Sequence, residues 1–236
     1  MSTADDPTGA AAWEPVLDDL AERRRDAEAM GGDERLARRR ARGKLDARAR
    51  VAALCDPGSV VEIGRLVGDL PADAFVAAIG TIDGRPAAVG AEDFTVAGGS
   101  IGAGGSAKRH RLAELAGQER MPLVMLLEGA GHRPPMPDDP PTRRAPGDLG
   151  AMADLAGVVP LVTAVLGPSA GHGALAAPLA DFTVMTPDAS IFAAGPPLVK
   201  ASIGEDVTKE ELGGPGVALA SGLIHNLATD DHDALE

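Results

Sequence analysis

Tyrosine is absent from this chain of 236 residues, and aromatic residues together make up only 2% of it. The single cysteine, Cys55, excludes an internal disulfide and is typical of a reducing compartment. No apolar run is long enough to span a bilayer, and the first ten residues do not resemble a signal peptide. These absences predict a globular cytoplasmic protein without a membrane segment. Its core must be built from Ala, Val, Leu and Ile packed against many glycines.

Positive charge is also scarce, because 22 Lys and Arg oppose 35 Asp and Glu for a net charge of −13. A nucleic-acid partner is therefore not expected. Residues 1–50 hold eleven of the basic residues and eleven acids, so this part is neutral. Its arginine clusters, 23–25 and 38–40, stand among acids at helical spacing. We interpret them as the solvated face of a helix with i,i+4 pairs.

The order of the predicted elements indicates an α/β protein. A terminal tip and helix over 1–29 precede a domain over 30–236. Apolar spacing and turn signals predict the following segments: helices over 13–42, 46–54, 107–120 and 149–157, a helix running to 180, and strands over 60–63, 75–82, 86–96, 122–127, 159–166 and 182–185, with a proline-rich mobile loop over 134–147. The repeated order of strand, glycine turn and helix favours a sheet of parallel strands. In such sheets ligands bind at the carboxyl ends of the strands.

The stretch GPSAGHG (167–173) allows two kinds of chemistry. Its first five residues fit G-x-S-x-G, the nucleophile elbow of serine hydrolases. That hypothesis needs a histidine and an acid next to Ser169, and nothing in the sequence places them there. Five-residue motifs also match often by chance. The hydrolase is therefore the weaker alternative.

In the second interpretation the backbone of the stretch carries the chemistry. A helix that begins at Gly171 points its first N–H groups and the positive end of its dipole above the strand end. A thioester carbonyl placed there is stabilised when it becomes an enolate. The turn EGAGHR (128–133), on a neighbouring strand end, would supply a second donor. The alternative is that both are plain tight turns between layers.

Several motifs in order resemble one known family: GKLDARARVAALCDPGSVVEI (43–63), EDFTVAGGSIG (92–102), PLVMLLEGAGHR (122–133), GPSAGHGALAAPLADF (167–182), and IFAAGPPLVKASIGEDVTKEELGG (191–214). Over about 30–236 the chain resembles the N-terminal half of the carboxyltransferase (beta) subunit of biotin-dependent acyl-CoA carboxylases, of the propionyl-CoA and 3-methylcrotonyl-CoA carboxylase type. The C-terminal half of such a subunit has no counterpart in this sequence.

The resemblance implies a crotonase-like α/β fold, a ββα superhelix. It implies transfer of a carboxyl group from carboxybiotin to the α-carbon of an acyl-CoA, or to the γ-carbon of a methylcrotonyl-type substrate, through an enolate held in a backbone oxyanion hole. Biotin would be carried by a partner, acyl-CoA would be the substrate, and no metal would be needed in this chain. The implied partners are a C-terminal-half carboxyltransferase chain and a biotin carboxylase or biotin carrier subunit, in a hetero-oligomer.

Carried onto this sequence, the resemblance assigns the oxyanion turns to four residues: Gly171, His172, Gly131 and His132. The family usually has a second glycine where His172 stands, so a side chain enters the turn here, although the backbone N–H is kept. The Ser169 hydroxyl has no assigned role.

The glycine-rich segment and the basic residues near it are predicted to bind CoA: Gly99, Ser100, Lys108, Arg109 and Arg133. For the basic residues after the glycines, a solvated first turn of the helix is the alternative. Two other functions stay open at this point. One is a biotin-independent acyl-CoA decarboxylase or lyase of the same fold, and the other is a non-catalytic assembly subunit.

Overall fold

The computed structural model describes residues 10–134 and 147–236, so most of the proline-rich segment predicted as a mobile loop lies outside the described residues. Its strands are β1 (Val61–Ile63), β2 (Phe75–Ile82), β3 (Arg85–Glu92), β4 (Leu123–Gly129), β5 (Leu161–Ala170), β6 (Phe182–Met185), β7 (Ser190–Phe192) and β8 (Asn226–Leu227). They form one sheet in the order β1-β2-β3-β4-β5-β6-β8, with β7 paired to β5. The first three are antiparallel neighbours, whereas β3 to β6 and β8 run parallel. The predicted α/β sheet with parallel strands is confirmed.

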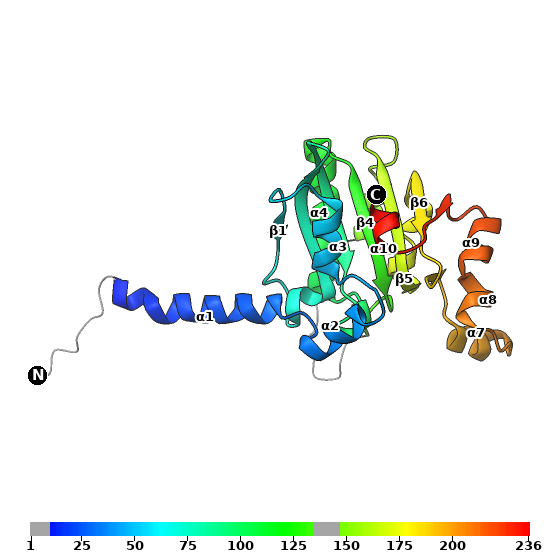
Figure 1. The fold of residues 1–236 in the computed structure, drawn as a ribbon, viewed down its shortest axis with the longest axis horizontal. Coiled ribbons are helices and arrows are strands. Elements are labelled where there is room, and N and C mark those ends of the chain that lie inside the picture. The colour runs from blue at the N-terminus through cyan, green and yellow to red at the C-terminus, as the bar shows by residue number, and fades with distance from the viewer. Residues whose placement is uncertain (1–9, 135–146) are drawn as a thin grey trace, which may run out of the picture.

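Helices cover both faces of this sheet. They are α1 (Ala10–Glu28), α2 (Asp33–Arg40), α3 (Ala47–Leu54), α4 (Ala103–Glu119), α5 (Asp148–Ala153), α6 (Gly171–Ala174), α7 (Pro196–Ile203), α8 (Lys209–Gly213), α9 (Pro215–Ala220) and α10 (Asp231–Leu235), with short 3-10 turns η1 (Pro71–Ala74), η2 (Ala97–Gly99) and η3 (Ala177–Leu179). Helices α3 and α10 lie over one face and α4 lies over the other (Figure 1). No helix in the described ranges is long and apolar enough to cross a bilayer.

Two apolar clusters, one on each face, form the core. One packs Leu112 and Ala116 of α4 against Leu123 and Met125 of β4. The other packs Val51 of α3 against the residues of β4 that alternate with these and therefore point to the opposite face. Small side chains let the layers approach closely, in keeping with the low aromatic content.

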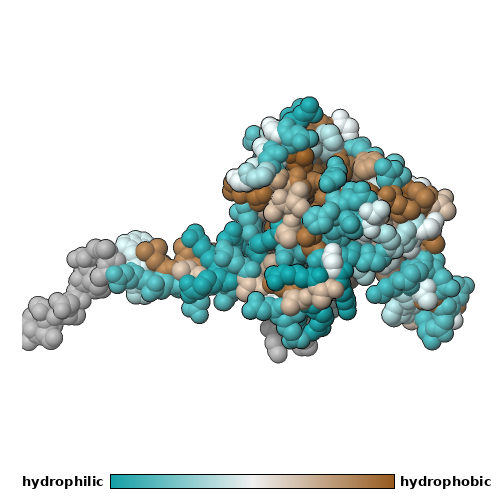
Figure 2. All heavy atoms as spheres, in the orientation of Figure 1, coloured by the Kyte–Doolittle hydropathy of each residue, from teal (hydrophilic) through white to brown (hydrophobic). Residues whose placement is uncertain are grey.

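Helix α1 projects away from the sheet, whereas α7 to α9 lie at the opposite end of the molecule (Figure 1). Helix α1 is largely hydrophilic, with apolar residues toward its outer end (Figure 2). Among these, Trp13 is 64% exposed. The helix predicted over 13–42 is in fact two helices, because Met30 and Gly32 both adopt positive φ, at 54° and 85°. A left-handed backbone cannot continue a right-handed helix.

Other predicted boundaries were wrong as well, among them the end of the strand predicted over 86–96, which stops at Glu92, and the end of the helix predicted over 149–157, which stops at Ala153. Helix α4 begins at Ala103 rather than 107, since the carboxylate of Asp73 accepts a hydrogen bond from Gly105 N in its first turn. Strand β5 continues to Ala170, so GPSA is strand and not turn. The helix predicted to run to 180 is the single turn α6, followed by the 3-10 turn η3 around Pro178.

Candidate active site

Two glycine turns meet at the carboxyl ends of β4 and β5. Gly131, just beyond β4, has φ +84°, and Gly171, at the end of β5, has φ +59°. A Cβ on Gly131 would stand 2.7 Å from the carbonyl oxygen of Ala170, and one on Gly171 would stand 3.5 Å from Gly131 Cα. The structure therefore brings together the two turns that the sequence singled out. Their role as oxyanion donors stays a prediction.

The glycine-rich segment before α4 fixes the first turn. Ile101 N donates to the carbonyl of Gly131, and Arg133 N donates to the carbonyl of Ile101, each at 2.8 Å. Gly99 lies so close to β4 that a Cβ would meet the carbonyl oxygen of Glu128 at 2.4 Å. No hydrogen bond in the described part of the chain uses the backbone N–H of Gly131 or of His132. Both donors stay available to a ligand.

The second turn leaves its donors free for a different reason. Gly171 and His172 open α6, and the first N–H groups of a helix have no partner within the helix. No side chain caps this turn, because the residue before it is Ala170. The uncommitted donors of both turns thus lie at one place on the sheet edge.

Two imidazoles flank the turns. The ring centroids of His132 and His172 are 5.6 Å apart, and the rings are tilted by 57°. His172 Nε2 lies 2.7 Å from Oδ1 of Asp148, a carboxylate that is 1% exposed. Burial by itself would raise the pKa of Asp148, but the hydrogen bond from His172 and the charge of Arg109 hold it below its usual value. Asp148 is therefore ionised and orients the imidazole.

Asp148 belongs to a buried chain of charges that begins at His172. Arg109 donates from Nε to Asp148 at 3.0 Å and from Nη1 to Glu92 at 2.9 Å, and Glu92 accepts from Glu128 N at 2.8 Å. Burial raises the pKa of Glu92 above its usual value even though the guanidinium of Arg109 opposes the shift. Sequence reasoning missed both carboxylates: Asp148 stands in no motif, and Glu92 opens the motif EDFTVAGGSIG (92–102), whose glycines and not its acid were assigned a role.

Two of the predicted CoA ligands lie in the interior. Lys108 is 5% exposed and donates to the carbonyls of Ala72 and Phe75, and Arg109 is 2% exposed. Burial lowers the pKa of Lys108 to about 8. The alternative of a solvated first turn is wrong for these two residues. Their predicted contact with CoA phosphates stays untested, and nothing in their surroundings supports it.

The remaining predicted CoA ligands form a group of their own. Arg133 Nη1 pairs with Asp73 at 2.6 Å, and its Nε donates to the hydroxyl of Ser100 at 3.1 Å. Its side chain is 25% exposed, so part of the guanidinium still reaches the surface. Arg133 and Ser100 therefore buttress the first glycine turn, with Gly99 packed beneath it.

Ser169 is not placed for nucleophilic chemistry. It lies in β5, paired with Gly129 of β4, and is completely buried. Its hydroxyl has no hydrogen-bond partner among the described residues. A serine nucleophile needs a base within hydrogen-bond reach, so the geometry disfavours the hydrolase hypothesis.

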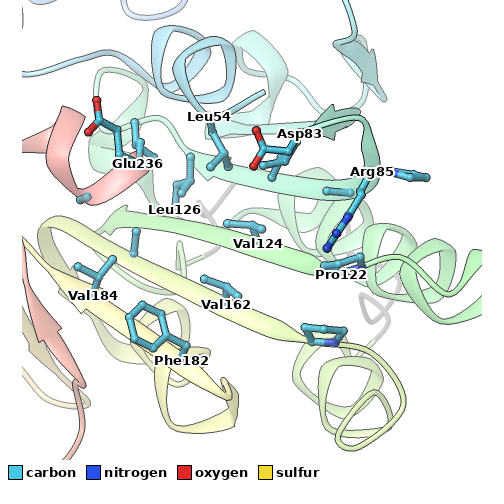
Figure 3. Close-up of a pocket in the computed structure, with 17 residues that line it drawn as sticks. Leu54, Asp83, Arg85, Pro122, Val124, Leu126, Val162, Phe182, Val184 and Glu236 are labelled. Atoms are coloured by element: carbon cyan, nitrogen blue, oxygen red, sulfur yellow. The ribbon is translucent and has the colours of Figure 1, made fainter. Parts of the chain in front are cut away.

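A separate hollow of about 500 Å³ lies over the face of the sheet on which α3 and α10 pack, toward the amino ends of β4 and β5 (Figure 3). Apolar side chains such as Val124, Val162 and Val184 form its floor, and Leu54 of α3 points into it (Figure 3). Three labelled side chains that line it are charged, namely Asp83, Arg85 and Glu236 (Figure 3). This hollow contains neither glycine turn, so the candidate site is at the carboxyl ends of the strands.

Comparison with known proteins relates this geometry to one family. The carboxyl transferase domain family matches residues 38–236. The chain is 38% identical over 240 residues to the methylmalonyl-CoA carboxyltransferase 12S subunit of Propionibacterium freudenreichii subsp. shermanii, covering 96% of the chain and 45% of that protein. It is 34% identical to the propionyl-CoA carboxylase beta chain of Saccharopolyspora erythraea, covering 47% of it. The chain spans about half the length of the curated relatives it matches.

Solved structures agree with this assignment. The transcarboxylase 12S hexamer, with methylmalonyl-coenzyme A bound, is similar at a TM-score of 0.80 and 33% identity, with 100% of this chain and 47% of that chain covered. The hetero-dimer MdcD-MdcE of a Pseudomonas malonate decarboxylase is similar at a TM-score of 0.64 and 30% identity, with 80% of this chain and 81% of that chain covered. The predicted crotonase-like fold is confirmed.

Proposed function

The chain belongs to the carboxyl transferase domain family, and from this premise we propose that it holds the acyl-CoA thioester during carboxyl transfer to the acyl chain. The observation that carries the proposal is the contact between the turns at Gly131 and Gly171, which concentrates free backbone donors at one point. The thioester carbonyl would lie there. Its oxygen gains charge when the α-carbon loses a proton, and fixed donors stabilise that charge without reorganising.

Each turn contributes in its own way. The N–H groups of Gly131 and His132 face the oxygen from one side, and the opening N–H groups of α6 face it from the other. The positive φ at both glycines is accessible without cost only to a residue that lacks a Cβ. Carboxybiotin on a separate carrier would supply the carboxyl group and take up the α-proton. This chain needs no nucleophile or metal for that step, and the γ-carbon would react instead in a methylcrotonyl-type substrate.

The proposed partners are a C-terminal-half carboxyltransferase chain and a biotin carboxylase or biotin carrier subunit. The relatives support assembly, since the named structures are a hexamer in a multienzyme core and a hetero-dimer. In this proposal residues 30–236 form the carboxyltransferase domain, and α1 in the 1–29 segment extends from it.

The test is to purify the chain from native extract and ask whether a second carboxyltransferase chain and a biotinylated protein accompany it. Light scattering and carboxylation of propionyl-CoA would then be compared for the chain alone and for the complex. We expect carboxylation only from a hetero-oligomer. A monomer that carboxylates propionyl-CoA without a second chain would contradict the proposal.

A second candidate is decarboxylation of an acyl-CoA without biotin, and the His172–Asp148 pair specifically favours it. When the bond to the carboxylate breaks and CO₂ leaves, the enolate must take up a proton, which a protonated His172 could give and later recover from water. In carboxylation the imidazole has no such task. His172→Ala therefore separates the two functions: it should stop the release of CO₂ from methylmalonyl-CoA but spare carboxylation.

A further inference from the structure

Two side chains beside the glycine turns have no task in the carboxyl transfer proposed above, namely the imidazole of His172 and the carboxylate of Asp148. His172 Nε2 lies 2.7 Å from Asp148 Oδ1. The Asp148 side chain is 1% exposed, and its other oxygen accepts a hydrogen bond from Arg109 Nε at 3.0 Å. An ionised carboxylate only accepts hydrogen bonds. The hydrogen in the contact with His172 is therefore carried by Nε2.

This contact sets the tautomer of the imidazole and with it the chemistry of the ring. When Nε2 of a neutral imidazole carries the hydrogen, Nδ1 keeps its lone pair. No hydrogen bond in the described part of the chain uses Nδ1 of His172. The side chain is 29% exposed, so water can reach that nitrogen. An imidazole that is held by a carboxylate through one nitrogen and is free at the other is arranged as a general base.

The base lies next to the free backbone donors. Nδ1 is only a few covalent bonds from the backbone nitrogen of His172, whose N–H opens α6 and has no partner within that helix. The N–H groups of Gly131 and His132 are also unused in the described ranges. A carbonyl carbon whose oxygen is held by these donors is therefore within reach of a water molecule that donates to Nδ1.

A second imidazole flanks the first. The ring centroids of His132 and His172 are 5.6 Å apart, and the rings are tilted by 57°. His132 is exposed, and its ring makes no hydrogen bond among the described residues. Each nitrogen of such a ring can exchange hydrogen bonds with water. The surroundings of His172 thus favour water as the molecule that gives up a proton to Nδ1.

We propose that this site also hydrolyses acyl-CoA thioesters, with His172 as the general base and Asp148 as the residue that positions it. Nδ1 takes a proton from water while the water oxygen bonds to the thioester carbonyl carbon. The carbonyl oxygen becomes an oxyanion, which the N–H groups of the two turns stabilise. The C–S bond then breaks, its electron pair leaves on sulfur, and the imidazolium gives its proton to the CoA thiolate.

The products are the carboxylic acid and CoA, and the imidazole returns to its first state. Water takes the place of the serine nucleophile, whose hydroxyl is buried in β5. This inference rests on the proposed function, because the same two turns hold the thioester in both reactions.

The test follows the release of the CoA thiol from propionyl-CoA by the full chain, with a thiol reagent that changes colour. The variants are His172→Ala, which keeps the backbone N–H, and Asp148→Asn, which removes the charge but keeps the shape. Their matched control is His232→Ala. His232 is exposed on α10, over the face of the sheet opposite α4, and its ring makes no hydrogen bond or ion pair in the described ranges. Circular dichroism checks that each variant is folded.

We expect the wild type and His232→Ala to release CoA at equal rates, and isotope-labelled water to label the propionate that forms. His172→Ala and Asp148→Asn should each lower kcat by about 100- to 10,000-fold. KM should change little, because a general base acts in the transition state and not on the bound substrate. A higher KM with an unchanged kcat in Asp148→Asn would mean that this carboxylate only shapes the binding site, and would overturn its positioning role.

Other outcomes would refute the hydrolysis itself. Equal kcat values for His172→Ala and His232→Ala would exclude the imidazole as the base. Exchange of the α-hydrogens of propionyl-CoA in deuterium oxide without release of CoA would mean that the base acts on the α-carbon instead of on water.

A binding measurement separates failure of this inference from failure of the proposed function. The probe is a ketone analogue of propionyl-CoA, in which a methylene group between sulfur and carbonyl prevents hydrolysis, and its affinity is measured by equilibrium dialysis. A wild-type chain that binds the analogue but releases no CoA refutes hydrolysis and leaves the thioester site standing. If the chain binds neither the analogue nor propionyl-CoA, the proposed function itself fails.

Discussion

Replacing Gly131 with alanine should stop turnover without unfolding the protein. Gly131 has φ +84°, and the new Cβ would stand 2.7 Å from the carbonyl oxygen of Ala170, the residue before Gly171. Ordinary van der Waals contact begins at 3.4 Å, so the two turns must separate by about 0.7 Å (3.4 − 2.7). The substitution thus moves one set of the proposed oxyanion donors away from the other.

The expected magnitude follows from the two effects of the methyl group. The left-handed backbone costs an alanine about 1–2 kcal/mol in stability. A misplacement approaching 1 Å can cost about 100-fold in rate, and losing one oxyanion donor costs about 100- to 1,000-fold. A fall in kcat of at least about 100-fold is therefore expected from a protein that remains folded.

Gly157→Ala is the matched control. Gly157 has φ +72°, but a Cβ there meets nothing within 4 Å, so it carries the backbone strain without the contact. Both variants should lower Tm by a few degrees, since 1 kcal/mol corresponds to about 2–4 °C in a chain of this size. Only Gly131→Ala should lose carboxylation of propionyl-CoA by the assembled enzyme. Equal kcat values for the two variants would refute the role of the turns.

Three further outcomes are expected. Ser169→Ala should keep most of the activity, and a fluorophosphonate probe should not label the protein. The reason is that the Ser169 hydroxyl is buried and without a partner in the described structure. Covalent labelling at Ser169 would restore the hydrolase hypothesis. His172→Ala should keep carboxylation. His172→Pro, checked for folding by circular dichroism, should lose about 100- to 1,000-fold in kcat because it removes a backbone donor. An equal loss in both variants would mean that the imidazole acts directly. Burial lowers the pKa of Lys108 from 10.5 to about 8, so between these values the unfolded chain binds more protons and the free energy of unfolding should rise with pH. Urea titrations of Lys108→Met should lack that rise, and an identical rise in wild type and variant would contradict the assignment.

The sequence alone determined the family and many, though not all, of the local elements. The apolar run over 75–82 and the Asp83-Gly84 turn that follows it predicted the bounds of β2 correctly, because strand propensity and turn chemistry depend on neighbouring residues. The order of the glycine motifs identified the carboxyltransferase family, and the segments 128–133 and 167–173 were both placed at strand ends. These are properties of short stretches, so they can be read without coordinates.

Only the tertiary structure decided which side chains share a site. Arg109 looked like a surface residue at the start of a helix, but its partners Glu92 and Asp148 lie 17 and 39 residues away and bury it. The orientation of His172 depends on the carboxylate of Asp148, which lies 24 residues away in the chain. A charged side chain is buried or exposed according to the partners that distant segments bring to it. No local pattern encodes those partners, because strand order and helix packing set the distances between segments.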